Sequence, residues 1–238
     1  MKKNIAIILA RGGSKGIPKK NVLDFCGHPL VAWSVIQAKL SKKIDDVYIS
    51  SDSQEILEIA NKYGAKIIKR PSNISGDSAK SEEAIYHAIN FLNEDIALIT
   101  MLEPTAPLRR PADLDNAINY FFKNNLDSCF SGAALSDFLI WKKDKHDQLV
   151  SVNYDYKKQG PRQEREPDYV ENGAIYMFTP EIFLKENNRF GGKIGLFMNN
   201  FWQSFEIDEK DDWDFVELVF KQYLLDGYKN LKQKEYKI

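Results

Sequence analysis

The stretch IAIILARGGSKGIPKKN, residues 5–21, joins an unbroken apolar run to a loop rich in glycine and lysine. Residues 5–10 are all apolar, which is typical of a strand buried on both faces of a parallel sheet. The loop that follows holds no acid and four cations, namely Arg11, Lys15, Lys19 and Lys20. Its glycines can turn backbone N–H groups inward as an anion-binding nest. Because open α/β sheets bind ligands at the carboxyl ends of their strands, we expect this loop to bind phosphate groups.

The composition of this loop favours a triphosphate over a single phosphate, since four cations stand beside the nest. The loop is not a Walker A motif, because Gly-Lys-Ser/Thr does not follow at the required spacing, and it does not match the G-x-G-x-x-G pattern of dinucleotide oxidoreductases. The alternative is a solvated surface loop. Its position directly after a buried strand favours the ligand-binding interpretation.

Apolar segments of strand length alternate with helical segments through the first half of the chain. Strands are expected at residues 47–49, 65–68 and 96–101, and helices are expected to begin at Pro29, at Ser51 or Asp52, and near Ser81. Strands separated by helices of this length imply a parallel sheet with right-handed crossovers. The sequence therefore predicts an α/β fold of Rossmann-like layout.

The second half of the chain has a different pattern. Further strands are expected at residues 128–134, 174–178 and 204–207, and helices at 180–186 and 211–225. Residues 137–156 alternate between short aromatic and polar groups without a helical period. We interpret this segment as β-hairpins of an arm that reaches outside the core sheet.

The composition excludes several functional classes. The 238 residues fit one domain, 43% of them are hydrophobic and 28% charged, and the formal charge is −1. Such a chain has no general basis for binding nucleic acid or an anionic membrane. Cys26, Cys129 and three scattered histidines argue against zinc and disulfide scaffolds. The apolar run 5–10 is too short for a signal peptide or a membrane span, so a cytoplasmic location is expected.

Residues 7–21 resemble the signature of the acylneuraminate cytidylyltransferases, the CMP-sialic acid synthetases. Further matches follow in the family's order: Arg70-Pro71 with Ser81, PTAPLR at 104–109, Arg162-Gln163, NGAIY at 172–176, and a late acidic strand. The resemblance implies an enzyme that joins CTP to a nine-carbon acidic sugar and releases pyrophosphate. It also implies a three-layer Rossmann-like nucleotidyltransferase fold with a mostly parallel sheet, formed by one domain over residues 1–238. A β-rich dimerisation arm at about 137–160 would make a homodimer.

The resemblance also assigns roles to the residues of the nucleotide side. Arg11, Lys15 and Lys20 would grip the phosphates and stabilise the charge of the departing pyrophosphate. The backbone and side chains nearest the nucleotide would be those of Ala10, Gly12, Gly13 and Asn21. Arg70 and Ser81 match positions at the cytosine end, whereas without the resemblance we would favour a surface arginine and a helix N-cap. Lys20 is expected to be an exposed loop cation that contributes little to stability.

Glu206 and Asp208 are the expected metal ligands. On a strand, residues two apart point to the same face, so both carboxylates could approach one cation. Carboxylate oxygens together with a nucleotide phosphate are the usual arrangement for Mg²⁺. The family commonly has two aspartates here, and the longer side chain of Glu206 would bind through water or shift the ion.

The residues of the sugar side contain one departure from the family pattern. The resemblance places Glu103, Arg162, Asn172 and Tyr176 at the sugar, with Arg162 binding its carboxylate. Glu103 stands where the family usually has glutamine, and an ionised carboxylate accepts hydrogen bonds but cannot donate them. This disfavours plain N-acetylneuraminate and makes legionaminic acid a candidate. Strand packing explains Tyr176 equally well, and Asn172-Gly173 is also a turn sequence.

Two alternative functions stay open at this point. One is a non-catalytic nucleotide- or sugar-binding homologue, which would show damaged metal carboxylates. The other is a cytidylyltransferase for pseudaminic acid or 3-deoxy-octulosonate. Pyrophosphate release with CTP, Mg²⁺ and a panel of sugars distinguishes these alternatives. No histidine lies in a matched motif, so no general base is assigned.

Overall fold

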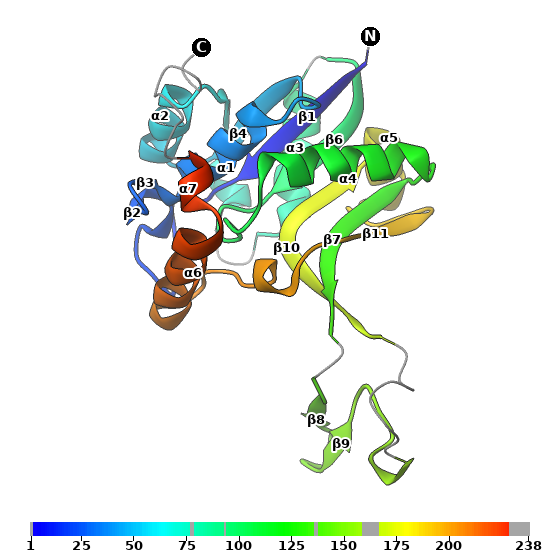
Figure 1. The fold of residues 1–238 in the computed structure, drawn as a ribbon. Helices are drawn as coiled ribbons and strands as arrows, with labels where there is room; N and C mark the ends of the chain where they lie inside the picture. Colours follow the sequence, from blue (N-terminus) through cyan, green and yellow to red (C-terminus); the bar gives the residue numbers. More distant parts are fainter. Residues whose placement is uncertain (1, 77–78, 93, 136–137, 159–166, 229–238) are drawn as a thin grey trace.

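A seven-stranded sheet forms the centre of the protein (Figure 1). The computed structural model describes residues 2–76, 79–92, 94–135, 138–158 and 167–228. The strand order is β11-β7-β10-β6-β1-β4-β5. Only β10 runs antiparallel to its neighbours in this sheet, so the expected mostly parallel sheet is confirmed. The strands are β1 (Lys3–Leu9), β4 (Asp46–Ser51), β5 (Lys66–Lys69), β6 (Ile96–Leu102), β7 (Ser128–Ala134), β10 (Tyr169–Phe178) and β11 (Ile194–Met198).

Helices cover both faces of the sheet. The described residues form α1 (Leu30–Leu40), α2 (Gln54–Lys62), α3 (Ser81–Phe91), α4 (Pro111–Lys123), α5 (Pro180–Glu186), α6 (Lys210–Tyr223) and α7 (Leu225–Tyr228). The buried side chains of β1 alternate between the two faces, as the side-chain period of a strand requires. Ala6 and Ile8 pack with residues of α1, α2 and α4. Ile5 and Ile7 pack with residues of α3 and α5. The expected three layers are therefore present.

A third apolar cluster fixes the end of the phosphate loop. Ile17, from that loop, packs with residues of α1 and with Trp213 and Phe220 of α6. The loop also approaches the segment before α6 closely, since a Cβ added to Gly16 would lie 2.1 Å from the Asp208 carbonyl oxygen. A glycine is therefore required at this contact. The packing brings residues almost two hundred positions apart to one side of the sheet.

Several elements differ from the sequence-based expectations. The expected strand at residues 204–207 is wrong, because that segment joins the short 3₁₀ helix Phe201–Gln203 to α6 without strand pairing, and its Ile207 N–H donates to the Thr105 carbonyl. The edge of the sheet is instead β11, which the sequence analysis missed together with α4. The side chain that caps α2 is that of Ser53, not of Ser51 or Asp52.

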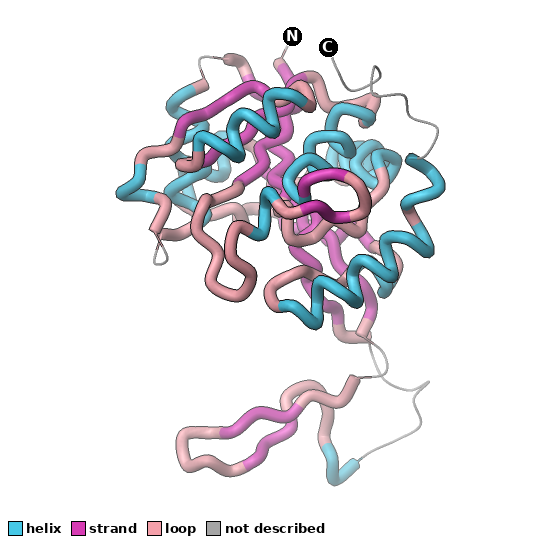
Figure 2. The backbone as a smooth tube through the Cα atoms, turned by 90° about the vertical axis from the view of Figure 1, so that its left-hand side faces the viewer, coloured by secondary structure: helices cyan, strands magenta, loops and turns pink. Residues whose placement is uncertain are grey.

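The segment expected to form an arm contains a β-hairpin outside the main sheet. Strands β8 (Trp141–Lys143) and β9 (Leu149–Ser151) pair antiparallel and lie beyond the ends of β7 and β10, away from the layered core in both views (Figures 1 and 2). Phe138, Ile140, Trp141 and Leu149 expose large parts of their apolar side chains. Within the described ranges, no helix has the length and apolar character needed to cross a membrane.

Candidate active site

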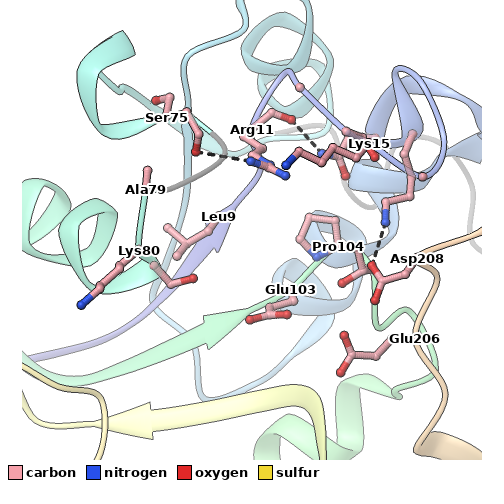
Figure 3. A pocket seen from close by; sticks show the side chains of 18 of the residues that line it. Leu9, Arg11, Lys15, Ser75, Ala79, Lys80, Glu103, Pro104, Glu206 and Asp208 are labelled. Carbon is pink, nitrogen blue, oxygen red and sulfur yellow. Dashed lines mark hydrogen bonds and ion pairs between the residues drawn. The ribbon is translucent and has the colours of Figure 1, made fainter.

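A pocket of about 590 Å³ lies at the carboxyl ends of β1, β5 and β6. The residues that line it come from the loops after these strands and from the segment before α6: Leu9, Arg11, Gly13–Gly16, Lys20, Asn21, Arg70, Ile74–Gly76, Ala79–Ser81, Glu103–Thr105, Glu206, Asp208 and Glu209. Figure 3 shows Arg11 and Lys15 on one side of this pocket and the carboxylates of Glu103, Glu206 and Asp208 on the other. The pocket therefore has a cationic side and an acidic side.

The phosphate loop is held in shape by its own side chains and by neighbouring loops. The Asn21 side-chain amide donates to the Arg11 carbonyl at 3.1 Å, and the Arg11 guanidinium donates to the Gly76 carbonyl at 3.3 Å. The Gly12 N–H donates to Asp52 at 2.9 Å. Gly12 and the buried Ala10 are not among the lining residues, whereas Gly13, Lys15, Lys20 and Asn21 are. The loop is therefore preformed, with Arg11, Lys15 and Lys20 lining the pocket.

Lys20 is buried, contrary to the expectation of an exposed loop cation. Its side chain is only 7% exposed, and its ammonium group donates to the Ile207 carbonyl and to Asp208 at 3.1 Å. Lys19, the next residue along the chain, is instead exposed and pairs with Glu55. The reason is the packing of the loop against the segment before α6, which covers Lys20. The ion pair between Lys20 and Asp208 thus links an expected phosphate ligand with an expected metal ligand.

Arg70 and Ser81 both line the pocket, from the loop after β5 and from the first turn of α3. Arg70 is buried, not a surface arginine, and its Nε has no hydrogen-bond partner. Burial lowers the pKa of Arg70, while Asp52 acts in the opposite direction. A buried arginine with an unpaired N–H is costly unless a ligand accepts from it. Ser81 is not the N-cap of α3, because that position is Lys80.

Glu206 lies on the acidic side, beside Thr105. Burial raises the pKa of Glu206 to about 7, and the charges of Glu103 and Asp208 add to this effect. A Cβ added to Gly173 would lie 2.1 Å from the Glu206 carboxylate, so a glycine is needed there. Acids that raise one another's pKa in a shared pocket are typical of a site that takes up a cation. Among the described residues, no group of three or more His, Cys, Asp or Glu side chains forms a metal site by itself.

Glu103 stands at the end of β6 on a loop that Arg109 organises. The fully buried Arg109 guanidinium donates to the backbone carbonyls of Glu103, Ala106 and Ala174 and to Ser34. Burial lowers the pKa of Arg109 to about 10. The PTAPLR motif therefore ends in an arginine whose contacts are structural. Burial raises the pKa of the Glu103 carboxyl, against the effect of Arg189 and Arg109.

Two other expected sugar ligands, Asn172 and Tyr176, are not among the residues that line the pocket. Asn172 is buried and accepts from Ser131 at 2.6 Å, and its side-chain NH₂ group has no hydrogen-bond partner. The Tyr176 hydroxyl donates to Glu171, and burial raises the pKa of Tyr176. Arg162 lies outside the described residues. The turn expected at Asn172-Gly173 is an irregularity within β10, where Gly173 has a φ of 61°.

Sequence reasoning missed one charged residue beside this group. Arg189, between α5 and β11, pairs with Glu82 at 2.9 Å and with Glu103 at 3.6 Å, and its guanidinium lies 4.8 Å from the centre of the Tyr176 ring. It lies in the sequence NNRFGG, whose pattern predicts only a turn. The one available signal was the glutamate at position 103, since a buried carboxylate needs a compensating cation.

Comparison with known proteins identifies the family. A profile of the cytidylyltransferase family matches residues 5–237. A pseudaminic acid cytidylyltransferase of Campylobacter jejuni is 33% identical over 92% of this chain and 97% of the relative. An N-acylneuraminate cytidylyltransferase of Oncorhynchus mykiss is 32% identical over 97% of this chain, which spans 52% of that protein. The chain belongs to the acylneuraminate cytidylyltransferase family. It is therefore a nucleotidyltransferase, as the resemblance implies.

Solved structures confirm the fold of this cytidylyltransferase. A CMP:2-keto-3-deoxy-manno-octonic acid synthetase complexed with CTP superposes with a TM-score of 0.71 at 15% identity, covering 94% of this chain and all of the other. A 4-diphosphocytidyl-2C-methyl-D-erythritol synthase of Anaerococcus prevotii gives 0.68 at 14% identity, covering 92% of this chain and 99% of the other. At these identities the likeness concerns the fold alone. The nucleotidyltransferase fold expected from the sequence is thus confirmed.

Proposed function

We propose that this enzyme transfers CMP from CTP to the anomeric hydroxyl of a nonulosonic acid that carries a second acylamino group, such as legionaminic or pseudaminic acid, and releases pyrophosphate. The observation that carries the proposal is the pocket with a cationic loop on one side and three carboxylates on the other. Such a site can hold a polyanion and its counter-cation together. A pseudaminic acid cytidylyltransferase and an N-acylneuraminate cytidylyltransferase match the chain with almost equal sequence identity, 33% and 32%.

The cationic loop supplies the chemistry of the leaving group. Arg11, Lys15 and Lys20 line the pocket and would contact the phosphates. When the sugar hydroxyl attacks the α-phosphorus, the bond to the bridging oxygen breaks and negative charge grows on pyrophosphate. Cations fixed in position before the reaction stabilise that charge without reorganisation. Arg70 and Ser81, which also line the pocket, would orient the cytidine part.

The acidic side suits a divalent cation. Glu206 and Asp208 would hold Mg²⁺ together with phosphate oxygens, since the part of the chain that the structure describes offers too few ligands by itself. The raised pKa of Glu206 is the observation that supports this, because a neighbouring cation would relieve the repulsion among the carboxylates. When bound, the metal would neutralise charge on the transferred phosphate. Asp208 would exchange its contact with Lys20 for this role, which leaves Lys20 to bind phosphate.

Glu103 is the residue that we expect to select the sugar. Its carboxylate faces the pocket from the end of β6 and, when ionised, accepts hydrogen bonds but cannot donate them. A second acylamino group on the sugar provides an N–H donor for it, which plain N-acetylneuraminate lacks at that position. N-acetylneuraminate carries a hydroxyl group there, which can also donate, so we expect a moderate preference and not exclusion.

The remaining parts of the proposal concern the number of domains, the oligomeric state and the location in the cell. We propose that residues 1–238 form one domain and that the arm at about 137–160 joins two copies as a homodimer. Its exposed apolar side chains, Phe138, Ile140, Trp141 and Leu149, support this, because such a patch on a projecting hairpin is typical of an interface. Light scattering of the full chain tests the dimer. A reaction that consumes CTP needs a nucleotide pool, so we propose a cytoplasmic location.

The direct test of the function measures pyrophosphate release with CTP, Mg²⁺ and a panel of acidic sugars. The panel contains N-acetylneuraminic, legionaminic, pseudaminic and 3-deoxy-octulosonic acid. We expect the highest kcat/KM with a sugar that carries two acylamino groups. Replacement Glu103→Gln should lower the preference for that sugar over N-acetylneuraminate by about tenfold. CTP binding without release for any sugar would instead indicate a binding homologue.

A further inference from the structure

Arg189 is held rigidly although it lies in a loop. The segment between α5 and β11 is tied to β7, because the Gly191 N–H donates to Ser128 at 3.1 Å and the Lys193 N–H donates to Asp127 at 2.7 Å. A Cβ added to Gly192, which has a φ of 58°, would lie 2.3 Å from the Asp127 carboxylate. These contacts anchor the end of the loop next to β7, directly after Arg189.

Three elements of the site meet at the Arg189 guanidinium. Its Nε donates to Glu82 of α3 at 2.9 Å, one residue after the pocket-lining Ser81. Its Nη1 lies 3.6 Å from the Glu103 carboxylate at the end of β6. Its plane lies over the ring of Tyr176 in β10. With a side chain only 16% exposed, the guanidinium is a shared partner and not a surface charge.

Glu103 needs this partner because its other charged neighbours, apart from Arg109, are acids. The like charges of Asp208 and Glu171 act to raise the pKa of Glu103. Glu103 and Asp208 act in the same way on the pKa of Glu206. Arg109 lies close, but its guanidinium donates to backbone carbonyls and to Ser34, not to the Glu103 carboxylate. Without Arg189, the carboxylate would face an acidic sugar with its charge uncompensated, which would weaken binding of that sugar.

We propose that Arg189 is a positioning residue for sugar selection: it balances and orients the Glu103 carboxylate so that this group can accept a hydrogen bond from an anionic nonulosonate. This inference rests on the proposed function. Arg189 does not line the pocket, so it acts through Glu103 and contacts no reacting atom. The cytidylyltransferase thus uses a charged pair at a position where its family usually has a neutral glutamine.

The experiment is a double-mutant cycle read as separate KM values for sugar and CTP. We expect Arg189→Gln to raise the KM for the preferred sugar by about tenfold and to change the KM for CTP by less than about twofold. In the Glu103→Gln background, the same substitution should change the KM for the sugar by less than about twofold, since no charge remains to balance. Arg189→Lys should retain part of the function.

A matched control is Arg110→Gln, which removes another stacked arginine, over Trp202, away from the pocket. It should leave both KM values unchanged. Equal effects of Arg189→Gln in the two backgrounds, or equal increases in both KM values, would show a merely structural role and overturn the inference. If Arg189→Gln does not fold, Arg189→Lys in both backgrounds gives the same comparison. No pyrophosphate release by the unmodified enzyme with any sugar would overturn the proposed function itself, and this inference with it.

Discussion

The two ends of the central parallel strands carry clusters of charge that are arranged in opposite ways. At the amino ends, the Lys3 ammonium lies 2.8 Å from Asp46 and 2.9 Å from Glu94, and Lys66 lies 2.7 Å from Asp46. The hydroxyl of Tyr48 also donates to Glu94, at 2.6 Å. At the carboxyl ends, Arg11 and Lys15 lie on one side of the pocket and the carboxylates of Glu103, Glu206 and Asp208 on the other (Figure 3), and Lys20 pairs with Asp208.

The pKa shifts of the acids record this difference. Hydrogen bonds from Tyr48 and Lys3 lower the pKa of Glu94. Burial acts to raise the pKa of Asp46, but hydrogen bonds from Lys3 and Lys66 outweigh it, so that this pKa is lowered as well. Burial raises the pKa values of Glu103 and Glu206 instead. At the amino ends, hydrogen bonds stabilise the charged forms of the acids, whereas burial and neighbouring carboxylates disfavour the charged forms of Glu103 and Glu206 in the pocket.

Lys20→Ala should give the largest effect on activity. It tests the carboxyl-end charge cluster directly, because Lys20 belongs to the phosphate loop and pairs with Asp208 on the acidic side. We expect turnover to fall by about 100-fold or more, because a fixed cation at the leaving group is lost. Since Lys20 is buried and bonded, the free energy of unfolding should also fall, by about 1–3 kcal/mol. Pyrophosphate release and chemical denaturation measure the two effects. The control is Lys19→Ala, an exposed neighbour, and wild-type turnover in Lys20→Ala would contradict the phosphate role.

Asp208→Asn tests the acidic side of the pocket. The substitution should reduce Mg²⁺-dependent turnover by about tenfold to 100-fold, because a charged ligand of the cation becomes a weak neutral one. A magnesium titration of the initial rate measures this effect. Asp211→Asn, in the first turn of α6 and outside the pocket lining, is the matched control. An unchanged magnesium requirement in Asp208→Asn would mean that the carboxylates are misassigned.

Glu206→Gln tests the comparison through the pH dependence of the free energy of unfolding. The folded pKa of about 7 exceeds the unfolded value of about 4.3, so the folded state binds more protons between them. The stability that Glu206 contributes is therefore present below about pH 4.3 and is lost as the pH rises to about 7. Without metal, Glu206→Gln should be more stable than the unmodified protein at pH 8, and this gain should shrink at pH 5. Denaturation in a chelator measures it.

Two outcomes bear on this pH argument. Glu209→Gln, an exposed neighbour, should show no such gain and serves as the control. A Glu206→Gln gain that is equal at pH 5 and pH 8 would contradict the repulsion among the pocket carboxylates, since packing alone would then explain it.

Asp46→Asn should give the smallest effect on activity. We expect a loss of about 1 kcal/mol in stability at pH 7 and turnover within about twofold of the unmodified enzyme. Because the pKa of Asp46 is lowered, the contribution is present above the unfolded value of about 3.9 and disappears as the pH falls through the folded pKa. Asp95→Asn, at a well exposed pair, is the control. A large loss of turnover would show that the amino ends also serve catalysis.

The sequence predicts the part of the fold that follows from local pattern. The apolar run at 5–10 and the alternation after it predict β1, its burial on both faces and the phosphate loop. The segment 204–207 looked like a strand because it is partly apolar, yet it makes no strand pairing, and β11 occupies the edge of the sheet. Sheet edges depend on partners distant in sequence, which a local pattern does not contain.

The candidate site likewise has features that the local sequence predicts and features that depend on distant residues. Arg11, Lys15 and Lys20 could be placed from one motif, but the burial of Lys20 depends on Ile207 and Asp208, which come from the other end of the chain. Arg189 belongs to no motif, and only folding brings it to Glu103. Long-range charge pairing thus decides the details that the sequence pattern leaves open.

The most direct test is calorimetric titration of the enzyme with CTP, CMP and cytidine in the presence of Mg²⁺. If the loop after β1 is a phosphate site, CTP should bind at least about 100-fold more tightly than cytidine, and Lys20→Ala should remove most of that difference. Equal affinities for CTP and cytidine, or no binding of either, would contradict the account.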